Sequence, residues 1–165
     1  MMGLQDPTYF VAWFIFMLGI IGVMSGLLVS TASLSVFSKS DITLIFTLSV
    51  LYGMTLYGFA FIVVSIFPSK KASATAASLV HLMSYYFAFM YKGYGSTQLQ
   101  KLVVSIIPNC ALAFAVDHLF HCELDGSGLD WNFAAMEYEN YTFFNGIAML
   151  AFDVVLYACI GYYLD

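Results

Sequence analysis

Charge is scarce in this chain of 165 residues: charged side chains make up 9% of it, arginine is absent, and five lysines stand against ten acidic residues. A soluble domain carries roughly a quarter charged residues, so this chain could not cover a globular surface with polar groups. Without a basic patch to neutralise phosphates, nucleic-acid binding is excluded. Intrinsic disorder is excluded too, because disordered chains are poor in apolar residues, whereas 62% of this chain is hydrophobic. The expected solvent is lipid.

Cysteines and catalytic motifs are also lacking. Cys110, Cys122 and Cys159 are too few and too scattered for a disulfide framework or a paired CxxC metal site. The chain has no GxxxxGK[ST], GxSxG, HExxH or GxGxxG motif. A signal peptide is not indicated, because a basic n-region is missing. We therefore expect a chain that is not an enzyme and that binds no cofactor itself.

Four stretches with almost no charge are long enough to cross a membrane, which takes about 20 apolar residues in a helix. They lie at about 9–37, 42–69, 72–91 and 141–164, and the last contains Asp153. Backbone polar groups cannot reach water in hydrocarbon, so the spans must be helices. The sequence predicts an all-α, polytopic membrane helix bundle with four transmembrane helices, in a membrane of unspecified type.

A fifth apolar stretch, residues 102–116, is shorter than a span and contains Pro108, which breaks a helix interior. We predict re-entrant or exoplasmic helices at about 97–122, followed by an exoplasmic connector at 123–140. The alternative is a fifth full crossing over 99–120. That crossing would place Asp117 and His118 in hydrocarbon at a large cost, so the re-entrant helical hairpin is favoured.

Orientation follows from lysine and acidic residues near the predicted ends. Lys70 and Lys71 form the strongest basic point, and basic turns are typically cytoplasmic. Residues 117–139 hold six acidic residues and no lysine, which favours an exoplasmic location. The sequon that follows makes Asn140 a candidate for glycosylation. With four crossings, both chain ends are cytoplasmic.

The most site-like cluster contains His118, His121 and Cys122, residue types that zinc accepts. Their spacing matches no closed zinc pattern, so an amphipathic turn leaving the membrane is favoured over a metal site.

Two polar residues fall inside predicted spans. Asp153 is costly in hydrocarbon and marks a functional or structural position by default. A hydrogen bond to a Ser, Thr or Tyr of a neighbouring helix is favoured over a proton or ion relay, because the spans contain no lysine or arginine to work with it. His81 is read as a packing residue. Gly19, Gly22 and Gly26 form a small-residue face that permits close helix approach.

Five segments together resemble one family. Residues 1–4 read Met-Met-Gly-Leu and precede Trp13-Phe14, residues 67–72 read Phe-Pro-Ser-Lys-Lys-Ala, and residues 107–114 begin Ile-Pro-Asn-Cys. Residues 126–131 read Gly-Ser-Gly-Leu-Asp-Trp, and residues 149–157 contain Met-Leu followed by Asp-Val-Val-Leu-Tyr. In this order they resemble the transmembrane domain of ATP-binding cassette transporters of the A subfamily, the lipid exporters.

The resemblance implies a partial transmembrane domain that forms part of a lipid translocation path. It implies that the stretch after residue 101 is the family's exoplasmic hairpin, that the turn at residues 69–71 is cytoplasmic, and that residues 1–8 adjoin a coupling helix. ATP and Mg would belong to a parent transporter with a nucleotide-binding domain absent from this chain. The implied partners are membrane lipids, that domain and the other half of the transporter. Two alternatives stay open: a stand-alone assembly or regulatory subunit, and an ion or proton carrier using Asp153.

Overall fold

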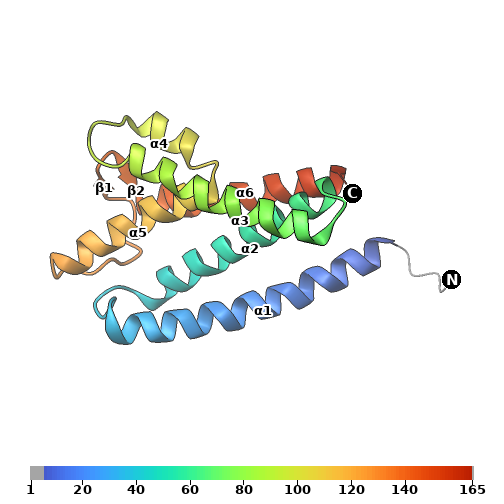
Figure 1. Cartoon of the computed structure of the whole chain (residues 1–165). Helices are drawn as coiled ribbons and strands as arrows, with labels where there is room; N and C mark the ends of the chain where they lie inside the picture. Colours follow the sequence, from blue (N-terminus) through green and yellow to red (C-terminus); the bar gives the residue numbers. More distant parts are fainter. Residues whose placement is uncertain (1–5, 165) are drawn as a thin grey trace.

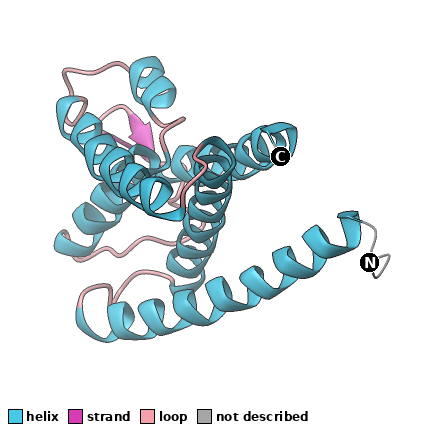
Figure 2. Ribbon diagram, turned by 45° about the vertical axis from the view of Figure 1, so that its right-hand side comes forward, coloured by secondary structure: helices cyan, strands magenta, loops and turns pink. Residues whose placement is uncertain are grey.

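The computed structural model describes residues 6–164, which form six helices and one small hairpin (Figure 1). The helices are α1 (Asp6–Ser35), α2 (Ile42–Ile66), α3 (Lys70–Met90), α4 (Gln98–Val104), α5 (Pro108–Leu124) and α6 (Phe143–Leu164). The strands are β1 (Glu137–Tyr138) and β2 (Tyr141–Thr142), which pair antiparallel. The all-α prediction is confirmed apart from this hairpin. Figure 2 shows how small the β structure is beside the helices.

Within residues 6–164, three helices are long and apolar enough to cross a membrane: α1 over Val11–Ser35, α2 over Ile42–Ile66, and α6 over Phe143–Leu164. The chain is therefore an integral membrane protein. The predicted boundaries differ from these helices by two or three residues at several ends, because Phe67, the residue before Pro68, ends α2 and the strand β2 precedes α6. The first part of the residue 1–8 segment lies outside the described residues.

Helix α3 begins where the sequence places the basic turn. The side chain of Ser69 accepts a hydrogen bond of 3.2 Å from the Ala72 N–H and caps the helix. Its first half is rich in Ser, Thr and Ala, which lowers its apolarity below that of α1, α2 and α6. Its second half exposes large apolar side chains, among them Leu82 and Met90.

The apolar stretch around Pro108 forms two helices rather than one. Helix α4 ends at Val104, and Pro108 is the first residue of α5, where its missing N–H costs nothing. Thr97 and Gln100 form a capping box that starts α4. A single helix over 99–120 is therefore not formed, and α4 and α5 make a helical hairpin whose tip is residues 105–107.

Helices α2 and α6 run in parallel through the centre of the bundle. A Cβ on Gly58 would meet Tyr157, and one on Gly161 would meet Phe61, so the residue numbers in contact rise together. Helix α5 crosses α6 in the opposite direction, with Gly146 close to Ala115. The smallest residue thus lies where each pair of helices approaches most closely.

Helix α1 lies along α2 at the outside of the bundle, and Ile21 packs against Gly53 (Figure 1). The glycine face of α1 is elsewhere: a Cβ on Gly19, Gly22 or Gly26 would have no atom of the described residues within 4 Å. The close approach predicted for that face is not made within the described part of this chain.

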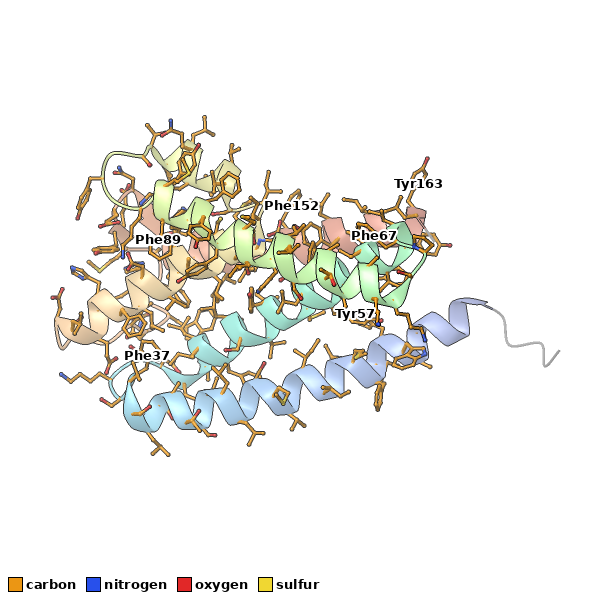
Figure 3. The ribbon with its side chains drawn as sticks, viewed as in Figure 1. Phe37, Tyr57, Phe67, Phe89, Phe152 and Tyr163 are labelled. Carbon is orange, nitrogen blue, oxygen red and sulfur yellow. The ribbon has the colours of Figure 1, made fainter. Side chains whose placement is uncertain are left out.

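Figure 1 also shows where the connections lie. The α1–α2 loop and the 125–142 segment lie at one end of the bundle, at the left of the view, whereas the α2–α3 turn and the end of α6 lie at the other. Apolar side chains cover the outside: Phe89 and Phe152, labelled in Figure 3, are 61% and 53% exposed. That surface suits a hydrocarbon solvent.

Candidate functional site

A polar network surrounds Asn109, the second residue of α5. The hydroxyl of Tyr52 on α2 donates a 2.6 Å hydrogen bond to Asn109 Oδ1. Asn109 Nδ2 donates to the Ser84 hydroxyl at 2.6 Å and to the carbonyl oxygen of His81 at 2.8 Å, both on α3. Asn109 is buried, and its amide joins α2, α3 and α5.

The imidazole of His81 takes part in this network. His81 Nδ1 is 3.2 Å from Asn109 Nδ2, and His81 Nε2 is 3.5 Å from the Tyr52 hydroxyl, so both ring nitrogens lie within hydrogen-bonding distance of it. Sequence reasoning singled out His81 but missed Asn109 and Tyr52. The available signal was an Asn directly after the proline that breaks the apolar stretch.

A groove of about 350 Å³ opens next to the network. Its walls come from α2, α3, the hairpin tip and α6, and include Phe59, Met83, Pro108 and Tyr157. The Tyr157 hydroxyl donates to the carbonyl oxygen of Ile106 at 3.2 Å, so α6 also holds the tip. The groove is mostly apolar, with its polar groups gathered at the network.

No protein-family model matches this chain. The protein "ATP-binding cassette sub-family A member 17" of Rattus norvegicus is 26% identical over 174 residues, which cover all of this chain and 10% of that protein. "Cholesterol transporter ABCA5" of the same species is 29% identical over 168 residues, 99% of this chain and 10% of that protein. "Phospholipid-transporting ATPase ABCA3", also from rat, is 25% identical over 138 residues, which cover 80% of this chain and 8% of that protein.

The chain is similar to A-subfamily ATP-binding cassette transporters. It spans about a tenth or less of the length of the A-subfamily proteins that it matches. The resemblance to A-subfamily transporters predicted from the sequence is confirmed as a similarity of 25% to 29% identity. The Met-Met-Gly-Leu segment that contributed to it lies outside the described residues.

The segment that resembles the A-subfamily G-x-G-[IL]-x-W turn ties the connector to the α1–α2 loop. Gly128 has a φ of +64°, and a Cβ there would collide with the carbonyl group of Lys39. The next residue, Leu129, is buried and donates its N–H to the Ser40 hydroxyl at 3.1 Å. The Trp131 indole donates to Thr43 at 2.8 Å. Gly128, Leu129 and Trp131 of this segment thus each have a physical role.

Glu123, at the end of α5, holds the same loop. Its carboxylate accepts hydrogen bonds from the Ser40 hydroxyl at 2.7 Å, the Lys39 N–H at 2.9 Å and the Ser38 hydroxyl at 3.3 Å. Burial alone would raise the pKa of Glu123, but these hydrogen bonds outweigh it and lower that pKa. The connector is attached to the α1–α2 loop rather than free.

Lys101 is the second polar centre at this end of the bundle. It is 1% exposed, and its ammonium donates to the Glu139 carbonyl oxygen, lies 3.8 Å from the Glu139 carboxylate and sits 5.4 Å above the Phe114 ring centroid. Burial lowers the pKa of Lys101, against the opposing charge of Glu139. Glu139 also accepts a hydrogen bond from the Gly93 N–H at 2.8 Å. The Lys101–Glu139 pair therefore joins α4, the loop before α4 and the β1–β2 hairpin.

Asn140 lies in the turn between β1 and β2. The φ angles of Glu139 and Asn140 are +49° and +60°, as a two-residue hairpin turn with both residues left-handed requires. The Asn140 amide donates to the carbonyl oxygens of Ser96 at 3.1 Å and Tyr94 at 3.3 Å. The candidate glycosylation site therefore has its amide nitrogen in use.

The zinc candidates do not converge. His118 is buried and stacks on Tyr138, and burial lowers its pKa. His121 Nδ1 lies 3.0 Å from Asp125 Oδ2, and Cys122 is half-buried. Among the described residues, no group of three or more His, Cys, Asp or Glu side chains could hold a metal ion.

Asp153 is fully buried on α6. It lies two turns after Gly146 and one turn before Tyr157, so the three share a helix face. Gly146 contacts Ala111 and Tyr157 reaches Ile106, which places Asp153 on the face toward the hairpin tip. Neither carboxyl oxygen has a hydrogen-bond partner among the described residues, so the hydrogen bond predicted from a Ser, Thr or Tyr is not formed there.

Proposed function

We propose that the chain is part of the membrane domain of an ATP-driven lipid transporter and forms part of the wall of its lipid path. The similarity to A-subfamily proteins over the whole chain carries this proposal. Two of those relatives are named for transport of cholesterol and of phospholipid. The groove between α2, α3, α6 and the hairpin tip is the surface best suited to hold part of a lipid.

In this proposal the chain crosses the membrane four times, at about 9–37, 42–69, 72–91 and 141–164, and α3 supplies the third crossing. The helices near 97–122 re-enter from the exoplasmic side and stop at the hairpin tip, and residues 123–140 stay exoplasmic. The grouping of the α1–α2 loop with the connector at one end of the bundle supports this arrangement (Figure 1). So does the position of Lys70 and Lys71 at the other end.

Transport by this chain requires partners. A nucleotide-binding domain and a second transporter half would supply ATP, Mg and the remaining wall, since the sequence carries no GxxxxGK[ST] motif. Movement of the ATP-binding part would reach the lipid path through changes in helix packing. Catalytic residues are therefore expected outside this chain.

The test is whether a polypeptide that binds ATP is isolated together with the chain. An antibody raised against the connector at 123–136 would be used to isolate the protein from its own cells after labelling with a photoreactive ATP analogue. We expect labelled polypeptide in the isolate, either in one longer product or in a bound partner. An isolate that holds the chain but no ATP-labelled polypeptide would contradict the proposal and favour the stand-alone regulatory subunit.

A further inference from the structure

Two imidazole rings of α5 lie against one tyrosine of the β1–β2 hairpin. His118 and His121 are about one turn apart on α5, and their ring centroids are 5.6 and 4.2 Å from that of Tyr138 on β1. We infer that this is a pH-sensitive contact, which holds β1 on α5 while His118 is neutral and releases β1 when His118 takes up a proton. The inference goes beyond the proposed function, because it concerns a response to acid and not the lipid path.

The burial of His118 is the first argument. Its side chain is 3% exposed, and its Nδ1 atom has no hydrogen-bond partner among the described residues. A neutral imidazole can leave one ring nitrogen as a bare acceptor, whereas the protonated ring carries an N–H on both nitrogens. Protonation in place would therefore bury a positive charge and an N–H that has no acceptor, and both are costly. The contact as folded suits the neutral ring.

The surrounding charges do not offset this cost. The ionisable groups that act on His118 or on the Tyr138 hydroxyl belong to α5, the loop after α3 and the hairpin: Asp117, His121, Lys92, Tyr94, Tyr138 and Glu139. Asp117 favours a proton on His118, but its carboxylate is already paired with Lys92 at 2.6 Å. A charge on His121 disfavours that proton. Burial is the largest cause, and the pKa of His118 is lowered from its ordinary value of 6.5.

The direction of the pH response follows from that lowered pKa. The folded chain binds the His118 proton less readily than a chain in which the ring lies in water. The His118–Tyr138 contact is therefore fully stable above about pH 6.5 and weakens as the pH falls below that value. Mild acid thus favours the state in which His118 has left Tyr138.

Strand β2 is held by a different contact, so the release is local to β1. The Tyr141 ring lies 5.3 Å from that of Phe114 on α5, and its hydroxyl is 3.0 Å from the Ser105 hydroxyl at the hairpin tip. This contact contains no imidazole. In the proposed orientation this end of the bundle faces the exoplasmic side, so the His118–Tyr138 contact responds to acid in that compartment.

The experiment measures amide hydrogen exchange in the full chain, reconstituted in vesicles with the same pH on both sides, at pH 7.5 and pH 5.5. Rates for residues 137–142 are divided by those of an unstructured peptide at the same pH. We expect the corrected rate to rise at pH 5.5 by up to about tenfold, the limit for one group one pH unit below 6.5. Glu123 does not contribute in this range, because its pKa lies below 4.5.

Three variants locate the response. His118→Phe keeps an aromatic ring against Tyr138 but binds no proton, so its corrected rate should be the same at both pH values. His118→Gln loses the ring, and its corrected rate should be higher than that of the wild-type chain at pH 7.5 but equally independent of pH. His121→Gln is the matched control, because the His121 side chain contacts the same tyrosine but is 44% exposed. It should keep most of the rise.

Two results would overturn the inference. One is a wild-type chain whose corrected rate is the same at both pH values, or whose rise at pH 5.5 survives in both His118 variants. The other is a rise that only His121→Gln abolishes, since the response would then belong to the exposed imidazole. Neither result bears on the proposed function, which the ATP-labelling experiment tests separately.

Discussion

The hydroxyl of Tyr52 lies 2.6 Å from Asn109 Oδ1, so the middle of α2 is bonded to the first turn of α5. Because the Asn109 amide also donates to the Ser84 hydroxyl and the His81 carbonyl group, one side chain bonds the start of α5 to both α2 and α3. The tip and the two helices are thereby held as one unit, and α6 joins through Tyr157 and Ile106.

Removing Asn109 should loosen this unit. Asn109→Ala leaves the hydroxyls of the buried Ser84 and the half-buried Tyr52 short of a partner, and we expect a loss of about 1–3 kcal/mol in the free energy of unfolding. Combining it with Tyr52→Phe should give a coupling energy of about 0.6–1.7 kcal/mol, the range for interhelical hydrogen bonds in membranes. The measurement is a double-mutant cycle on the reconstituted chain. Strictly additive losses would show that the 2.6 Å contact contributes nothing.

The two lysine–carboxylate pairs should differ strongly in stability. Lys101→Ala removes a buried cation from Glu139 and should cost about 3–5 kcal/mol, because the largely buried carboxylate loses its ion-pair partner. Lys92→Ala removes a shorter pair, 2.6 Å from Asp117, but the Lys92 side chain is 51% exposed. It should cost about 0–1 kcal/mol. Thermal unfolding in detergent compares them, and equal losses would contradict the role of burial.

The sequence predicted elements whose causes are local. The length of the nearly uncharged stretches predicts α1, α2 and α6. Pro108, which breaks a helix interior, predicts two helices in place of one, and Gly128 indicates a turn. It could not predict contacts between distant segments. Lys101 counted only as a charge at a membrane edge, yet it is buried against Glu139, 38 residues away. The place of Asn109 directly after Pro108 was a local signal, but its three partners come from two other helices and could not be predicted.

Labelling of introduced cysteines tests the proposed orientation. Ser127→Cys should react with a membrane-impermeant thiol reagent from outside intact cells, and Ser69→Cys only after the membrane is opened. Both serines are exposed. Gly128 is a poorer position, since a side chain there would collide with Lys39. The background should lack Cys110, Cys122 and Cys159, replaced by serine. The reverse pattern would invert the orientation.

Acid should weaken the attachment of the connector to the α1–α2 loop. The pKa of Glu123 is lowered from its ordinary value of 4.5 in the folded chain. The folded state therefore binds fewer protons than the unfolded state, and the stabilisation by Glu123 is full above about pH 4.5 and lost as the pH falls through the folded pKa. Glu123→Gln should lower the melting temperature at pH 7 but change it little at pH 3.

Glu137→Gln is the control for that measurement, because Glu137 is an exposed carboxyl group in the same connector. Its melting temperature should follow that of the wild-type chain at every pH. A Glu123→Gln difference that stays constant between pH 7 and pH 3 would mean that the carboxylate charge does not hold the loop.

Replacing Asp153 should make the chain more stable. Its carboxyl group is buried with no hydrogen-bond partner among the described residues, so the folded state bears the full cost of removing it from water. Asp153→Leu removes that cost with a side chain of the same branched shape and should raise the free energy of unfolding by about 1–3 kcal/mol. Asp153→Asn keeps a polar group and should gain less. Unfolding of the reconstituted chain measures both. A loss of stability in both variants would show that Asp153 has a partner in the membrane, and proton flux through wild-type vesicles that Asp153→Asn abolished would favour the carrier alternative.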